Sequence, residues 1–100
     1  MLTITAIITA KKGHEATMRQ ALEMVAENVR ASEPGTIGFY ISQDAKNSSV
    51  FTTYERFVDQ AAIDRHNNSA ASQGFFKIAK PILEGEVILV TGAEISKKER

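Results

Sequence analysis

The chain contains no cysteine and no tryptophan among its 100 residues, and only two prolines. Without cysteine it cannot form a disulfide framework, a zinc site built on thiolates or a thiol nucleophile. Its 12 basic and 12 acidic residues cancel, so no net field attracts nucleic acid or an anionic membrane. No apolar run approaches the roughly 18 residues that a membrane-spanning helix requires. These absences predict a small soluble domain, which we expect in the cytoplasm, without nucleic-acid or membrane partners.

What is present is ordinary for one globular domain, with 43% apolar and 24% charged residues. We assign residues 1–95 to a single domain and residues 96–100, which are mostly charged, to a solvated C-terminal tail. A chain of this length buries only about 60–70% of its unfolded surface, so a partner subunit would help to stabilise it.

Apolar periodicity divides the chain into alternating strands and helices. The Glu33-Pro34-Gly35 segment must end the first helix, because proline disfavours helical backbone in the residue before it. Pro-Gly also suits a type II turn. Asp59 is placed to cap the second helix at its N-terminus. The expected elements are a strand over 1–10, a helix over 14–32, strands over 36–44 and 50–57, helical segments over 59–66 and 75–82, and a strand over 86–95.

The order β-α-β-β-α-β is typical of ferredoxin-like α+β folds. Right-handed crossovers place both helical regions on one face of a four-stranded antiparallel sheet. The opposite face is then too apolar to remain in water, so we expect a second copy to cover it, sheet against sheet, in a homodimer. The residues expected on that face are Thr3, Thr5, Ile7, Tyr40, Thr52, Tyr54, Ile88 and Val90.

Glu55 and His66 are the strongest candidates for chemistry. Strand alternation puts Glu55 on the helix-facing side, and helical spacing puts His66 on the buried stripe of the second helix. A buried carboxylate needs a partner, and an imidazole is a suitable one. The pair could remove the proton of a bound phenol in a cavity between sheet and helices. The aromatic walls expected for this cavity are Phe39, Phe51, Phe57, Phe75 and Phe76.

Structural roles for both residues stay open at this point. His66 near the end of a helix could instead cap that helix and interact with its dipole. Glu55 could be satisfied by backbone groups or by an arginine. His14 and His66 are far apart in the sequence and no cysteine accompanies them, so we expect no metal site.

The sequence resembles the antibiotic-biosynthesis monooxygenase (ABM) domain family from Leu2 to about Val90. The resemblance is carried by the order and spacing of short motifs. These are Glu33-Pro34-Gly35, Tyr40, Tyr54-Glu55-Arg56-Phe57, Asp59 with Ala62 and His66, and Phe75-Phe76.

This resemblance implies a dimeric α+β barrel and, for active members, oxygenation of small aromatic or quinol substrates without metal, flavin or haem. Carried onto this chain, it makes His66 the base or hydrogen-bond partner and Glu55 the residue that orients it. Tyr54, Arg56 and Phe57 are secondary candidates for substrate contact. We therefore expect a cofactor-independent monooxygenase acting on a small phenol or quinol.

The chain also departs from the family pattern. Members commonly carry tryptophan where this chain has Phe57, and the asparagine and histidine of the haem-degrading branch have no counterpart, which argues against haem degradation. The family also includes isomerase-like members and members without known activity. Two alternatives therefore remain: a proton-transfer enzyme acting on a small carbonyl compound, and a non-catalytic dimeric module that binds a small ligand.

Overall fold

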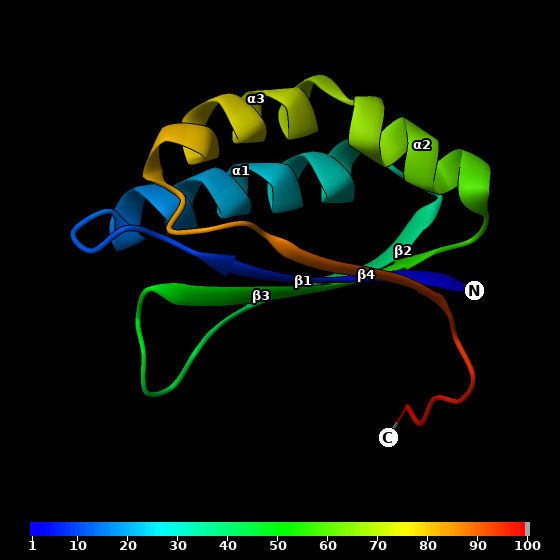
Figure 1. Ribbon diagram of the computed structural model, residues 1–100. Coiled ribbons are helices and arrows are strands. Elements are labelled where there is room, and N and C mark those ends of the chain that lie inside the picture. Colours follow the sequence, from blue (N-terminus) through cyan, green and yellow to red (C-terminus); the bar gives the residue numbers. More distant parts are fainter. Residues whose placement is uncertain (100) are drawn as a thin grey trace.

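The computed structural model describes residues 1–99 and confirms the predicted ferredoxin-like α+β fold (Figure 1). Residue 100, the end of the predicted tail, lies outside the described residues. The elements are β1 (Leu2–Thr9), α1 (Glu15–Ser32), β2 (Thr36–Gln43), β3 (Val50–Phe57), α2 (Gln60–Asn68), α3 (Ala70–Ala79), the 3-10 turn η1 (Lys80–Ile82) and β4 (Ile88–Ala93).

The four strands form one antiparallel sheet in the order β2-β3-β1-β4. Figure 1 shows all three α-helices on one side of this sheet, as the crossover rule predicts. Thr5 of β1 lies opposite Tyr54 of β3 and Val90 of β4, and Tyr54 lies opposite Tyr40 of β2. These four residues therefore share the helix-free face, which we call the outer face.

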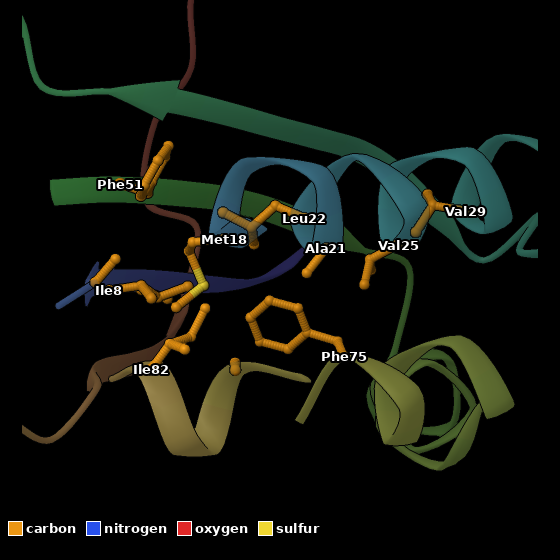
Figure 2. Close-up of a cluster of buried hydrophobic side chains, with 12 residues drawn as sticks. Ile8, Met18, Ala21, Leu22, Val25, Val29, Phe51, Phe75 and Ile82 are labelled. Carbon is orange, nitrogen blue, oxygen red and sulfur yellow. The ribbon is translucent and has the colours of Figure 1, made fainter. Parts of the chain in front are cut away.

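The main hydrophobic core lies between α1, α3 and the sheet (Figure 2). Met18, Leu22 and Val25 follow one stripe of α1 and pack with Phe51 of β3 and Phe75 of α3. A second, smaller cluster forms where α2 meets β1 and the end of β3, and it contains Ile4, Phe57, Ala62 and Ile63. The space between these two clusters is where the candidate site lies.

The second helical region differs from the expectation in its boundaries. Asp59 caps α2 as predicted, since its carboxylate accepts the backbone N–H of Ala62 at 2.9 Å. The helix then continues to Asn68, and α3 starts at Ala70, before the expected Phe75. Ser69 separates the two helices, because its hydroxyl accepts the N–H of Ser72 at 3.1 Å and so caps α3. The final strand is shorter than expected and covers Ile88–Ala93.

The turn at Pro34-Gly35 also differs from the expectation. A type II turn needs a positive φ at its third residue, and within residues 1–99 positive φ occurs only at the glycines Gly13 and Gly85. Gly35 is needed for another reason: a Cβ atom at this position would lie 2.7 Å from the Ala62 Cβ. The missing side chain lets α2 pack directly against the start of β2.

The C-terminal residues lie on the outer face (Figure 1). Arg56 of β3 donates two hydrogen bonds of 2.8 Å to the Glu94 carboxylate and lies 3.6 Å from the Glu99 carboxylate. Residues 94–99 form no regular secondary structure and fold back below the sheet. In the described part of the chain, no helix has both the length and the hydropathy needed to cross a bilayer.

Candidate functional site

The imidazole of His66 lies between the carboxylates of two glutamates from distant parts of the chain. Its Nδ1 lies 2.7 Å from Glu33 Oε1, and its Nε2 lies 3.3 Å from Glu55 Oε1. All three side chains are only 8% exposed. The structure therefore brings together the predicted pair, Glu55 and His66, and adds a third member that the sequence did not reveal.

Each carboxylate is held by further hydrogen bonds. Glu33 follows the last turn of α1 and accepts hydrogen bonds from Asn28 Nδ2 at 2.8 Å and Thr36 Oγ1 at 2.9 Å. Glu55, on the helix-facing side of β3, accepts one from Thr53 Oγ1 at 2.7 Å. Because every member of the cluster has a partner, the burial of three ionisable groups is tolerated.

The imidazole is fixed in position by the fold of α2. His66 lies in the last turn of this helix, and its backbone carbonyl accepts the Ser69 hydroxyl at 2.9 Å. The rings of Phe39 and Phe57 pack against the imidazole with centroid separations of 5.6 and 5.4 Å. The predicted helix-capping role thus does not describe the side chain, which points into the protein toward the sheet.

The two carboxylates determine the charge of His66. Burial among aromatic rings lowers the pKa of the imidazole, but hydrogen bonds and Coulomb attraction from Glu55 and Glu33 outweigh this effect and raise it. In the protonated ring both nitrogens donate, one to each glutamate. His66 is then a cation without a free lone pair, and Glu55 is its partner on the cavity side.

A cavity of about 280 Å³ lies beside this cluster, between the sheet and the helices α1, α2 and α3. The buried polar side chains of its lining are Thr53, Glu55, His66 and Ser72, and we call the part at Glu55 and His66 its polar end. The exposed residues Gln60, Asn67 and Thr91 also line the cavity. Most of its remaining walls are apolar, which suits an aromatic ligand. These walls include Ile4, Ala6, Ile8, Leu22, Val25, Phe39, Ile63, Phe75, Phe76, Val87 and Leu89.

The predicted substrate-contacting residues divide into three groups. Phe39, Phe75 and Phe76 line the cavity, as predicted. Phe51 and Phe57 are fully buried and belong to the two core clusters instead of the cavity lining.

The prediction for Tyr54 and Arg56 needs the larger correction. Both residues adjoin Glu55 in β3, and strand alternation directs their side chains to the outer face. There Tyr54 lies opposite Tyr40, and Arg56 pairs with Glu94. Neither residue reaches the cavity.

A sequence model of the family described as "Antibiotic biosynthesis monooxygenase" matches residues 1–78. The chain belongs to this family. Among solved structures, one named antibiotic biosynthesis monooxygenase superposes with a TM-score of 0.88 at 19% identity, covering 96% of this chain and 100% of the other. A Pseudomonas aeruginosa protein gives a TM-score of 0.86 at 27% identity, covering 95% and 94%. A Mycobacterium tuberculosis protein gives 0.89 at 16% identity, covering 98% of each chain. No curated protein matches the sequence.

Two functional candidates in this family member escaped the sequence analysis. The sequence placed Glu33 only in the turn that ends the first helix. In the structure its side chain contacts His66, which is 33 positions away in sequence. An acidic residue inside the family motif Glu33-Pro34-Gly35 was the available signal. The second is Ser72, a cavity-lining residue in the first turn of α3, whose buried hydroxyl has no hydrogen-bond partner within residues 1–99. Helical periodicity gave no sign of it.

Within residues 1–99, no group of three or more histidine and acidic side chains is arranged to hold a metal ion. Glu33 and Glu55 approach opposite nitrogens of the same ring, so they do not converge on one point. In this antibiotic biosynthesis monooxygenase member, both contacts between His66 and the two glutamates join an imidazole nitrogen to a carboxylate oxygen, so each can carry a proton.

Proposed function

We propose that the chain is a cofactor-independent monooxygenase that oxidises a small phenol or hydroquinone with dioxygen, and that its active site is the cavity beside His66. The observation that carries this proposal is the buried Glu33–His66–Glu55 cluster at the polar end of an apolar cavity. Family membership supports the same class of reaction.

The proposed first step is removal of the phenolic proton by Glu55. A protonated His66 has no lone pair to accept it, whereas the Glu55 carboxylate 3.3 Å away does. His66 then stabilises the phenolate by its positive charge and by hydrogen bonding, and the apolar walls strengthen that attraction by excluding water. These roles reverse the ones suggested by sequence, where His66 was the base and Glu55 oriented it.

The phenolate itself would supply the electrons for the second step. The para carbon of a phenol bonds to dioxygen and gives a hydroperoxide, after Glu55 returns the proton. In a 1,4-hydroquinone the para carbon already carries oxygen, so the hydrogen-bearing ring carbon next to the phenolate carbon reacts instead. The O–O bond then breaks, the remaining hydrogen leaves that carbon as a proton, and the products are a quinone and water. The substrate loses four electrons and dioxygen gains four, so no external reductant is needed.

Oxygen uptake with 1,4-naphthohydroquinone and anthrone, in chelator-treated buffer, tests this proposal. We expect one dioxygen consumed per ketone or quinone formed, with one ¹⁸O atom entering the product from ¹⁸O₂. His66→Ala should lower turnover more than tenfold, and Glu55→Gln should reduce it to the protein-free background. Uptake that never exceeds this background would reject the monooxygenase.

The same samples separate the two alternatives. Saturable ligand binding without oxygen uptake would favour a binding module. Solvent deuterium entering a bound carbonyl compound would favour a proton-transfer enzyme, because Glu55 could return its proton to carbon as well as to oxygen.

We also propose that the protein acts as a homodimer that joins two outer faces. Ile7, Tyr40, Tyr54, Ile88 and Val90 are exposed there, and such a surface is unfavourable in water. The charge of Arg56 is paired with Glu94, so two copies can approach without strong repulsion. The cavity lies on the other side of the sheet, and dimer formation leaves it open.

A further inference from the structure

Five residues of the cavity lining are exposed: Gln60, Asn67, Phe76, Leu89 and Thr91. The two apolar ones among them are Phe76 of α3, which is 55% exposed, and Leu89 of β4, which is 60% exposed. The cavity therefore reaches the surface beside two large apolar side chains. We call this opening, defined by Phe76 and Leu89, the apolar mouth.

Leu89 lies on the helix-facing side of the sheet. It is paired with Ala6 of β1, which is buried in the main core. A leucine in this position is normally covered by a helix. Here β4 is the terminal strand of the sheet, and among residues 1–99 no helix packs extensively on it. The proposed dimer would cover the outer face, so a partner subunit would not shield Leu89 either.

The two ends of the cavity have opposite character. Glu55 and His66 are buried and ionisable, whereas Phe76 and Leu89 are apolar and more than half exposed. A compact phenol could occupy the polar end, yet it would leave Phe76 and Leu89 in contact with water. Covering those side chains requires an apolar group attached to the phenol, and apolar area removed from water contributes directly to affinity.

We propose that the substrate is an elongated, amphipathic phenol whose hydroxyl lies at Glu55 and whose alkyl or prenyl chain leaves through the apolar mouth. This inference rests on the proposed function for the position of the hydroxyl. It adds the substrate class, since one end of the ligand must ionise and the other must be apolar. The length of the substrate's alkyl chain sets the affinity, and its phenolic end undergoes the reaction.

The test is a series of 4-alkylphenols from methyl to hexyl, titrated by calorimetry. The titrations are run without oxygen, so the phenols bind without being oxygenated. At full burial each methylene tightens binding about fourfold, and in a half-open mouth we expect about twofold per methylene. In Phe76→Ser and Leu89→Ser the gain in affinity per methylene should fall to a factor near one.

Met24→Ser is the matched control, because Met24 of α1 is 63% exposed and does not line the cavity. This variant should keep the wild-type dependence on chain length. Three results would overturn the proposal. They are an affinity that depends on alkyl chain length as strongly in Leu89→Ser as in the wild type, an affinity of the wild type that does not depend on chain length, and no binding of any alkylphenol.

The substrate class and the proposed reaction can fail separately. Oxygen uptake with hydroquinones that is insensitive to alkyl chain length would reject only the elongated substrate. Binding that follows chain length, without oxygen uptake by the matching alkylhydroquinones, would reject only the monooxygenase. Tight binding of fused-ring phenols together with a flat alkyl series would show that the mouth takes a rigid ring system, and this too would overturn the proposal.

Discussion

Gly35 and Ala62 are packed so closely that a methyl group at position 35 would come within 2.7 Å of the Ala62 Cβ. Gly35 belongs to the same turn as Glu33, and Ala62 lies one helical turn before His66. This close approach between the turn and α2 accompanies the 2.7 Å contact between Glu33 and His66. A steric requirement at one glycine thus helps to position the ionisable cluster.

Gly35→Ala should push α2 away from the sheet. We expect a loss of about 1–3 kcal/mol in the free energy of unfolding, the usual cost of overpacking, measured by urea denaturation. Gly74→Ala is the control, because Gly74 lies within α3 and a Cβ there meets nothing within 4 Å. That variant should gain about 0.5–1 kcal/mol from helix propensity. Equal effects of the two substitutions would contradict the packing argument.

Stability should depend on pH through His66. Its pKa is raised in the folded protein above the ordinary 6.5 because the attraction of Glu55 and Glu33 outweighs the opposing effect of burial. The folded state therefore binds this proton more tightly than the unfolded state does. The resulting stabilisation is complete below pH 6.5 and is lost as pH rises through the folded pKa, by at most about 1.4 kcal/mol per pH unit. Urea denaturation between pH 6 and 9 measures it, and His66→Gln should lack this component.

Glu33→Gln should act on His66 without altering the cavity lining. Glutamine can still accept the Nδ1 hydrogen bond but carries no charge, so the pKa of His66 should fall and kcat should decrease about tenfold with little change in KM. An NMR titration of the imidazole ring measures the first effect directly. Glu23→Gln is the matched control, since Glu23 is exposed and its ion pair with Arg19 spans 3.9 Å at the surface. If both variants behave alike, Glu33 does not position His66.

Ser72→Ala should separate stability from ligand binding. The Ser72 hydroxyl is buried without a partner, so its removal should leave the free energy of unfolding unchanged or raise it by up to about 1 kcal/mol. If a bound phenol uses this hydroxyl, the affinity for 4-methylphenol should fall about threefold to tenfold. Unchanged affinity would exclude Ser72 from ligand contact.

Val90→Asp should disrupt the proposed dimer. Val90 is 59% exposed at the centre of β4 on the outer face, where a buried carboxylate would have to lose its hydration. Light scattering after size-exclusion chromatography should then give the mass of one chain, about 11.0 kDa. Met24→Asp, on the helical side, should leave the assembly intact. A monomeric wild-type protein at micromolar concentration would reject the dimer itself.

The fold could be predicted because its elements have clear periodicity. The expected 50–57 strand matches β3 (Val50–Phe57), and the spacing of Met18, Leu22, Val25 and Val29 predicted the buried face of α1. Where local signals were weak, the observed helix boundaries differ from the expected ones. Ser69 both ends α2 and starts α3 through one side chain, and apolar spacing alone does not reveal such a cap.

The candidate site could be predicted only in part. Glu55 and His66 each lie on a buried face, so alternation and helical spacing could bring them together. Glu33 lies in a turn without periodicity, and only the packing of α2 on Gly35 brings it to the imidazole. Tyr54 and Arg56 became secondary candidates only through the family resemblance, whereas strand alternation places them on the face opposite to Glu55, as the structure has them.

The position of β4 has a consequence for how the protein must be handled. This strand ends the sheet, and its consecutive residues Ile88, Leu89 and Val90 are all more than half exposed. A free strand edge with such side chains can pair with the same edge of another molecule, which is a route to aggregation. A subunit released by dilution would also expose the outer-face residues Ile88 and Val90, so it should tend to precipitate or form fibrils, and the proposed dimer would then protect solubility.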